Sequence, residues 1–192
     1  MLIGVLALQG AFREHQWSLE KCGAQTRQVR KPRELDGLDA LVIPGGESTT
    51  MGKLLKDFDL MEPIKKLARA GMPVFGTCAG LIMLAKHIRN STQETLALMD
   101  IEVERNAFGR QVDSFEVDLH MPWLGKTPYR AVFIRAPYIT RVDNEVEVLA
   151  RFNEKIVCAR QGRFLVAAFH PELTDDLRLH RFFLNKIVNE QI

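Results

Sequence analysis

The sequence has few cysteines and lacks both a long uninterrupted hydrophobic run and a recognisable leader. Its three cysteines, Cys22, Cys78 and Cys158, are an odd number, which argues against a disulfide framework and favours a reducing compartment. The longest uncharged stretch, about residues 70–85, contains proline and several glycines and is a poor candidate for a transmembrane helix. The first fifteen residues have no basic leader or cleavage site for a signal peptide. We therefore expect a cytoplasmic protein.

An excess of charge of one sign is also missing. The 26 basic residues nearly balance the 24 acidic ones, and the signs are interspersed, so nothing in the chain calls for a nucleic acid or a membrane as partner. Hydrophobic residues make up 46% and charged residues 26%, which excludes a disordered or fibrous protein. The histidines have no spacing typical of a metal site, and we expect neither metal nor cofactor. The length of 192 residues predicts one domain over residues 1–192.

The first half of the chain alternates between strand-like and helix-like segments. The expected strands cover residues 2–8, 24–29, 40–43 and 73–77, and the expected helices cover residues 11–21, 49–57, 61–70 and 80–87. Continuous apolar runs such as residues 2–8 are typical of buried parallel strands. The alternation predicts a parallel sheet with helices on both faces.

The second half is rich in strands. We expect strands over residues 101–104, 114–118, 131–135, 146–151, 155–160 and 164–169. Most of the intervals are too short for helices, so several of these strands must pair antiparallel, with Phe152-Asn153-Glu154 as a hairpin loop. A last helix is expected over residues 175–189, with Thr174 as its cap. The predicted fold is an α/β three-layer sandwich with a mostly parallel mixed central sheet.

Residues 76–80, Gly-Thr-Cys-Ala-Gly, are the strongest local signal for chemistry. An apolar strand precedes them and a helical pattern follows, which is the arrangement of a nucleophile elbow with Cys78 as nucleophile. The glycines allow a tight turn, and the start of a helix favours the thiolate. The amide of Ala79 is a candidate oxyanion donor. The competing interpretation is that Cys78 is a small buried hydrophobic residue.

A histidine and a carboxylate follow the last expected strand, in Phe169-His170-Pro171-Glu172. A cysteine nucleophile needs a base, and the base needs an acceptor that orients it. His170 and Glu172 can supply both, and the carboxyl ends of parallel strands are where such residues meet. Taken alone, this motif is more typical of an ordinary surface loop, and only together with the elbow does it favour a triad.

A third segment, residues 44–50 with the sequence Pro-Gly-Gly-Glu-Ser-Thr-Thr, follows an apolar strand. Paired glycines let a backbone approach a ligand closely and expose its N–H groups. A phosphate-binding loop would need a Gly-Lys-Ser/Thr ending, which this segment lacks. Ser48 or Thr49 is also expected to cap the next helix.

The three segments together resemble the class I glutamine amidotransferases, which carry a cysteine at a glycine elbow and a His-x-Glu pair late in the chain. Further segments resemble one member family, the glutaminase subunits of pyridoxal 5'-phosphate synthase. They are residues 6–11 with Glu14-His15 following, residues 44–49, residues 105–111 and residues 133–137. The resemblance runs from the first strand to the final helix.

The resemblance implies a Cys78, His170 and Glu172 triad that hydrolyses L-glutamine, with Gly46 and Ala79 as oxyanion donors. It implies glutamine binding by Gly46, Glu47, Ser48, Arg105, Ile134 and Arg135. Composition alone would describe the two arginines as solvated side chains, although an arginine suits the α-carboxylate. The resemblance further implies a barrel-shaped synthase subunit as partner, which receives the ammonia, and a place for Gln9 near the site.

Three alternatives stay open at this stage. The chain could be another class I amidotransferase subunit, feeding a nucleotide or histidine pathway. It could be a stand-alone cysteine hydrolase of the same fold, although those usually place histidine directly after the nucleophile, where this chain has Ala79. It could also be a regulatory subunit without turnover, against which the intact Cys78, His170 and Glu172 argue.

Overall fold

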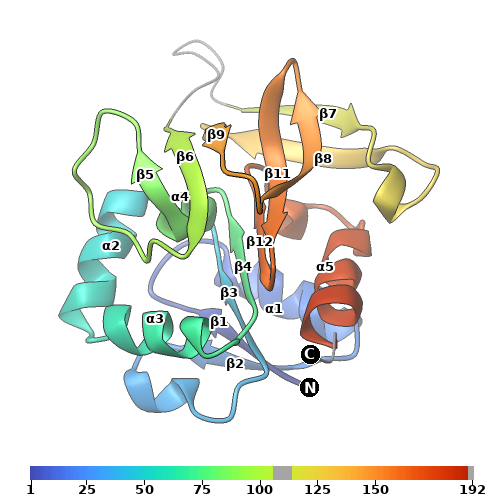
Figure 1. Ribbon diagram of the computed structural model, residues 1–192. Helices are drawn as coiled ribbons and strands as arrows, with labels where there is room; N and C mark the ends of the chain where they lie inside the picture. The colour runs from blue at the N-terminus through green and yellow to red at the C-terminus, as the bar shows by residue number, and fades with distance from the viewer. Residues whose placement is uncertain (106–113, 190–192) are drawn as a thin grey trace.

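The structure is a computed structural model that describes residues 1–105 and 114–189 (Figure 1). One half of its central sheet is parallel, in the order β2-β1-β3-β4-β12. These strands are β1 (Leu2–Leu6), β2 (Gln25–Val29), β3 (Ala40–Ile43), β4 (Val74–Thr77) and β12 (Phe164–Ala167). Every residue of β3 and β4 is buried, as expected for strands covered on both faces.

The sheet continues from β12 with mostly antiparallel pairs, in the order β12-β11-β9-β6-β5, and β10 also pairs with β11. These strands are β5 (Ala85–Ile88), β6 (Met99–Glu104), β9 (Tyr138–Val142), β10 (Glu147–Phe152) and β11 (Lys155–Gln161). The predicted hairpin loop is confirmed, because Phe152 pairs with Lys155 and the two residues between them have positive φ angles. Strand β9 was not predicted.

Two strands form a separate antiparallel sheet, β7 (Ser114–Leu119) and β8 (Tyr129–Ile134). The rings of Phe115 and Phe133 stack across this pair with centroids 4.8 Å apart. Phe133 also packs edge-on against Phe169, just after β12, at 5.6 Å. These aromatic contacts join the small sheet to the end of the main one.

Helices lie on both sides of the main sheet, which gives the predicted three layers (Figure 1). Helices α1 (Phe12–Lys21) and α5 (Arg178–Phe182) contact each other on one side. On the other side lie α2 (Ser48–Asp57), α3 (Met61–Arg69) and α4 (Ala79–Leu84), and α2 contacts α4. Short 3-10 helices cover Pro32–Leu35, Pro122–Leu124 and Pro171–Leu173, and a π-helical segment covers Phe183–Val188.

Two helix predictions need correction. The helix expected over residues 80–87 ends at Leu84, because Ala85 is extended and begins β5 on the edge of β6. The last helix begins at Arg178, and its N-cap residue, Leu177, makes no capping side-chain bond. Thr174 instead accepts a hydrogen bond from the amide of Asp176, 3.3 Å away, and so stabilises the turn before the helix.

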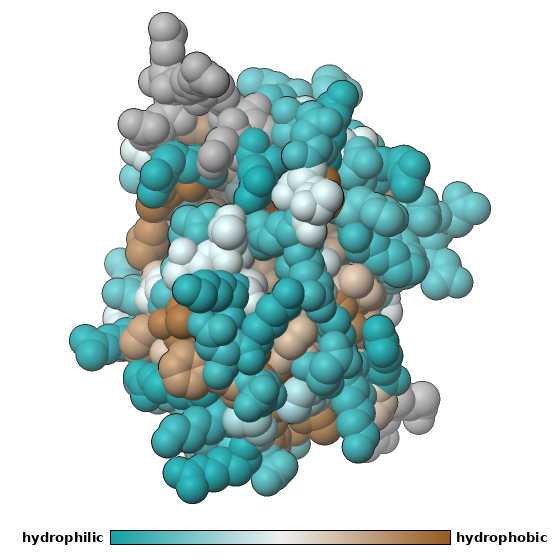
Figure 2. Space-filling view, turned by 90° about the vertical axis from the view of Figure 1, so that its left-hand side faces the viewer, coloured by the Kyte–Doolittle hydropathy of each residue, from teal (hydrophilic) through white to brown (hydrophobic). Residues whose placement is uncertain are grey.

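The surface is mixed in polarity. Figure 2 shows the side that lies at the left of Figure 1, where hydrophilic residues surround separate hydrophobic spots. Within the residues that the structure describes, none of the helices has the length and apolar character needed to cross a membrane. Cys158 is fully buried in the core, and Cys22 packs against the core at the end of α1, so both act as packing residues.

Candidate active site

A cavity of about 740 Å³ opens at the carboxyl ends of β3 and β4. It brings together residues from distant parts of the sequence, and eight of the ten predicted site residues line it. Its lining includes Gly46, Glu47, Ser48, Cys78, Arg105, Ile134, Arg135 and His170. Glu172, which contacts His170, and Ala79, which follows Cys78, are buried and do not line the cavity.

Cys78 sits in the tight turn between β4 and α4. Its φ angle is 49° and its ψ angle is −103°, which is strained for a residue with a side chain. A Cβ atom at Gly76 would lie 2.6 Å from the carbonyl group of Gly80, and one at Gly80 would overlap the carbonyl oxygen of Ile43. The predicted strained elbow is therefore present, and close backbone packing is the reason for both glycines. Cys78 is 6% exposed and lines the cavity.

His170 follows β12 and faces Cys78 from the neighbouring strand. Its Nδ1 atom lies 2.8 Å from Oε1 of Glu172, and its backbone amide donates to the carbonyl of Val132 in β8 at 2.8 Å. Glu172 is itself 4% exposed. Cys78 and His170 both line the cavity and Glu172 lies behind the imidazole, so thiol, imidazole and carboxylate follow one another from the cavity into the protein.

The electrostatics of these three residues favour a charged imidazole at His170. Burial lowers the pKa of His170, but hydrogen bonds to Cys78 and Glu172 and the charge of Glu172 outweigh it and raise the pKa to about 10. Burial raises the pKa of Glu172, but the neighbouring His15 and His170 rings outweigh it and hold that pKa below its usual value. His170 is therefore well suited to take a proton from a thiol while Glu172 stays ionised.

The glycine loop after β3 is held by the side chain of Gln9. The Gln9 amide group donates to the carbonyl of Glu47 at 2.9 Å and accepts from the Glu47 amide at 3.1 Å. Gly46 has a φ angle of 143°, and a Cβ atom there would lie 2.6 Å from the Gln9 amide nitrogen. Gln9 therefore lies against the loop, as expected, and its close approach requires glycine at residue 46.

The helix after this loop is capped by Glu47. Its carboxylate accepts hydrogen bonds from the amides of Thr49, at 3.1 Å, and Thr50, at 2.6 Å. The expectation that Ser48 or Thr49 would cap α2 is therefore wrong, because the longer side chain of Glu47 reaches both amides first. Burial raises the pKa of Glu47, but the bonds from Thr50 and Thr49 outweigh it and lower the pKa to about 2.

The remaining predicted substrate residues, Arg105, Ile134 and Arg135, also line the cavity. Arg105 donates to Oε1 of Gln93 at 3.0 Å and to the Thr49 hydroxyl at 3.3 Å. The carbonyl oxygen of Ile134 lies 3.9 Å from the Cys78 sulfur, and Arg135 has a φ angle of 40° at the end of β8. Residues 106–111, which also carried the family resemblance, lie outside the described residues.

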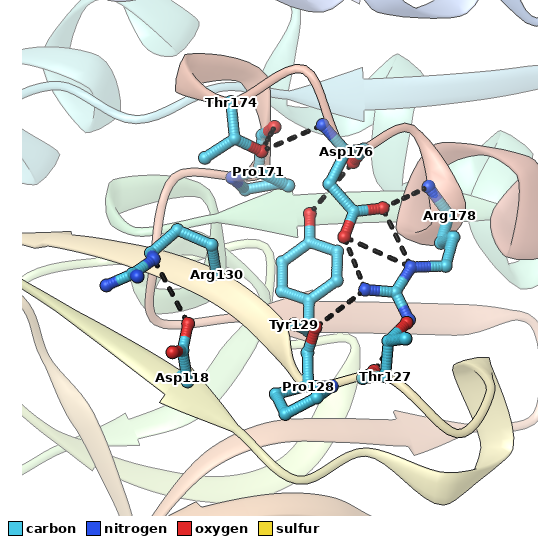
Figure 3. Close-up of polar contacts among 9 residues, drawn as sticks. All are labelled: Asp118, Thr127, Pro128, Tyr129, Arg130, Pro171, Thr174, Asp176 and Arg178. Atoms are coloured by element: carbon cyan, nitrogen blue, oxygen red, sulfur yellow. Dashed lines mark hydrogen bonds and ion pairs between the residues drawn. The ribbon is translucent and has the colours of Figure 1, made fainter.

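The segment that carries Glu172 is fixed to the start of β8 by Arg178 (Figure 3). The Arg178 guanidinium donates to the carbonyl oxygens of Thr127 and Pro128, both at 2.8 Å, and to the carboxylate of Asp176. The Tyr129 hydroxyl donates to the backbone carbonyl of Asp176 at 3.3 Å. The guanidinium of Arg178 thus bridges the residues before β8 and the residues before α5, and it holds the turn after Glu172 in place.

The whole arrangement agrees with one protein family. The model of the SNO glutamine amidotransferase family matches residues 5–189. The chain belongs to the SNO glutamine amidotransferase family.

Named relatives of this SNO family chain cover it almost completely. It is 68% identical to pyridoxal 5'-phosphate synthase subunit PdxT of Pelotomaculum thermopropionicum, over 98% of this chain and 96% of the relative. It is 65% identical to the subunit of the same name from Desulforamulus reducens, over 97% of this chain and 100% of the relative.

Solved structures agree with the fold. A crystal structure of a glutamine amidotransferase superposes with a TM-score of 0.92 at 49% identity, covering 98% of this chain and 99% of the other. PurLQS from Thermotoga maritima gives a TM-score of 0.72 at 17% identity, covering 96% of this chain and 98% of the other. The second likeness is one of fold alone.

The structure adds residues to the SNO family site that sequence reasoning missed. Gln93 joins two walls of the cavity, because its amide group donates to the Ser48 carbonyl at 2.9 Å while its oxygen accepts from Arg105. Arg89 and Glu104, which form an ion pair at 3.2 Å, also line the cavity. These residues belong to no motif, and nothing in their spacing could have identified them. Among residues 1–105 and 114–189, no cluster of three metal-binding side chains occurs.

Proposed function

We propose that this chain is the glutaminase subunit of a pyridoxal 5'-phosphate synthase and hydrolyses L-glutamine to L-glutamate and ammonia. The single observation that carries the proposal is the polar chain from Cys78 through His170 to Glu172, with Nδ1 of His170 2.8 Å from Oε1 of Glu172. Membership of a glutamine amidotransferase family and the names of relatives up to 68% identical support the substrate and the pathway.

In the first half of the reaction, the thiolate of Cys78 attacks the side-chain amide carbon of glutamine. His170 holds the proton that leaves the thiol, and Glu172 keeps the imidazole in the orientation that this transfer needs. The carbon–sulfur bond forms as the carbonyl π electrons move to oxygen. The intermediate then collapses, the carbon–nitrogen bond breaks, and the nitrogen leaves as ammonia with the proton from His170.

In the second half, water hydrolyses the glutamyl thioester. His170, now neutral, accepts a proton from the water as its oxygen attacks the thioester carbon. The carbon–sulfur bond breaks, glutamate leaves, and the proton returns to the sulfur or stays shared with His170. One water is consumed for each glutamine, and the protein ends in its starting state.

Binding and charge stabilisation are assigned to the walls of the cavity. We assign the oxyanion to the backbone amides of Gly46 and Ala79, since a negative oxygen needs donors at the elbow and on the opposite loop. Gly46, Glu47, Ser48, Arg105, Ile134 and Arg135 are assigned to glutamine, and all six line the cavity. An arginine guanidinium can bind the α-carboxylate through two parallel hydrogen bonds.

The proposal includes a partner and a location. The ammonia passes to a barrel-shaped synthase subunit, so the working protein is a hetero-oligomer. The location is cytoplasmic, which the three free cysteines, unpaired within the described structure, favour. No cofactor has a role in the hydrolysis.

Glutamate formation tests this function directly. The purified chain is given L-glutamine with and without the synthase subunit, alongside the Cys78→Ala variant. Cys22→Ala is the matched control, because Cys22 lies at the end of α1, outside the cavity. We expect glutamate from the wild type and the control in the presence of the synthase subunit, and none above background from Cys78→Ala.

Each other outcome contradicts a defined part of the proposal. Absence of glutamate from the wild type, with the synthase subunit present, would contradict the glutaminase function. Full activity of Cys78→Ala would show that another group is the nucleophile. Ammonia that never reaches the synthase product, although glutamate forms, would contradict the assignment of the partner.

A further inference from the structure

Two buried histidines lie directly behind the carboxylate of Glu172. His15 of α1 and His180 of α5 are both 0% exposed. Nε2 of His15 lies 3.3 Å from Oε2 of Glu172 and 3.0 Å from the hydroxyl of Thr77, the residue before Cys78. Nδ1 of His15 lies 3.1 Å from Nε2 of His180. The polar chain that starts at the thiol therefore continues through Glu172 to a second pair of imidazoles.

Both of these histidines are neutral. Burial lowers the pKa of His15, more strongly than the charge of Glu172 raises it. Burial and the neighbouring His15 lower the pKa of His180 to about 3. A neutral imidazole carries one proton, so each ring has one donor and one acceptor nitrogen.

The contacts decide which nitrogen of His15 carries its proton. If Nε2 were bare, its lone pair would face a carboxylate oxygen at 3.3 Å, and the two would repel. The proton therefore belongs on Nε2, where it forms the hydrogen bond to the Thr77 hydroxyl and lies beside Oε2 of Glu172. Nδ1 of His15 must then accept, and Nε2 of His180 must donate to it. The remaining nitrogen, Nδ1 of His180, has no hydrogen-bond partner among the described residues, as suits a bare nitrogen against apolar neighbours.

The second oxygen of Glu172 depends on this arrangement. Oε1 is held by His170 at 2.8 Å. Oε2 is buried and within hydrogen-bond geometry of no described residue, so the N–H of His15 is the polar group that faces it. A buried carboxylate oxygen without such a neighbour is costly, and Glu172 would rotate or take up a proton to avoid it.

We propose that His15 is a positioning residue of the glutaminase reaction, which fixes the Glu172 carboxylate from behind, and that His180 sets the tautomer of His15. The proposal rests on the function proposed above. His15 touches neither the cavity nor the reacting atoms, because it does not line the cavity. It acts through Glu172, which in turn orients His170 toward Cys78.

This role predicts a separation between catalysis and binding. Loss of the His15 donor should lower kcat for glutamine hydrolysis by about tenfold to a hundredfold, the size of effect seen when the outer partner that orients a metal-bound histidine is removed. KM for glutamine should stay close to that of the wild type, since the cavity walls are unchanged. A merely structural role would instead change stability without this split.

The experiment compares four variants with the wild type, all in complex with the synthase subunit. His15→Leu removes the donor, and His15→Gln places an amide N–H near the position of Nε2. His15→Asn keeps a polar side chain that is too short to reach Glu172. His120→Leu is the matched control, because His120 is exposed on the surface. We expect slow turnover from the Leu and Asn variants, recovery of most of the rate in the Gln variant, and wild-type kinetics from the control.

Thermal denaturation accompanies the kinetics, so that a variant that does not fold is recognised. If His15→Leu unfolds, the comparison of His15→Gln with His15→Asn still decides the matter. Equal kcat values for the Asn, Gln and wild-type proteins would overturn the positioning role. Nitrogen NMR of histidine-labelled protein should show His15 protonated on Nε2, and a proton on Nδ1 would also overturn it.

Failure of this inference differs from failure of the proposed function. If the wild type forms no glutamate, the glutaminase function is wrong. If the wild type is active and Cys78→Ala is not, the function stands. In that case a His15→Leu variant with wild-type kcat contradicts the positioning role alone.

Discussion

Two glycines inside helices should respond in opposite ways to the same substitution. Neither Gly52 of α2 nor Gly80 of α4 has a positive φ angle, so neither needs the conformational freedom of glycine. An added Cβ at Gly52 would lie 3.5 Å from its nearest neighbour, in ordinary contact. At Gly80 it would overlap the carbonyl oxygen of Ile43 and lie 2.9 Å from the carbonyl carbon.

The magnitudes follow from these distances. Alanine is favoured over glycine inside a helix by about 0.5–1 kcal/mol, so Gly52→Ala should raise the free energy of unfolding by about that amount. For Gly80→Ala, the new Cβ must clear the Ile43 carbonyl oxygen, the nearer of the two atoms, which moves α4 away from β3 by about 1 Å or more. Overpacking of this kind costs about 1–3 kcal/mol, which outweighs the gain in helix propensity.

The same movement should impair catalysis, because Cys78 lies two residues before Gly80 in the same turn. A misplacement of about 1 Å can cost a hundredfold in rate, so Gly80→Ala should lower the rate by about tenfold to a hundredfold. Gly52→Ala should leave glutamate formation unchanged. Thermal denaturation should show Tm higher by about 1–4 °C for Gly52→Ala, and lower by about 2–12 °C for Gly80→Ala.

The reasoning would be refuted if Gly80→Ala stabilised the protein as much as Gly52→Ala and formed glutamate at the wild-type rate. Close packing of α4 on the Ile43 carbonyl would then not be the reason for glycine at residue 80. A loss of rate without a loss of stability would also contradict the argument, because both effects are attributed to one displacement.

Two further predictions concern the supports of the site. Glu47→Ala should lower stability at pH 7 by about 0.5–2 kcal/mol, the usual effect of losing a cap. Because the folded state lowers the pKa of Glu47 from 4.5 to about 2, the contribution of this carboxylate is complete above pH 4.5 and is lost as the pH falls toward 2. Urea unfolding of both proteins at pH 7 and near pH 2 should therefore show a difference that shrinks in acid, and a constant difference would contradict the cap. Arg178→Ala should lower the free energy of unfolding by about 1–3 kcal/mol. Arg178→Lys should recover less than half of this loss in thermal denaturation, because one ammonium group cannot replace the guanidinium bonds to Thr127, Pro128 and Asp176. Full recovery of stability by lysine would show that these bonds are unimportant.

Much of the fold was predictable because its signals are local. Continuous apolar runs marked β1, β3 and β4 as buried strands, since a strand covered on both faces has no polar side. The elbow was predictable for the same reason, because a strand, two glycines, a cysteine and a helix follow one another within a few residues. The end of α4 was not predictable from local signals, because Ala85 leaves the helix to pair with β6, and that pairing depends on a strand further along the chain.

The sequence by itself determined which residues could do the chemistry: a cysteine in a glycine turn, and a histidine two residues from a carboxylate. Only the tertiary structure decided what surrounds them. Gln9 meets Glu47 across 38 residues, and His15 meets His180 across 165. Such contacts leave no periodicity in the chain, because they depend on how helices and strands pack and not on the spacing of neighbours. Burial in that packing is also what lowers the pKa of both histidines and favours their neutral form.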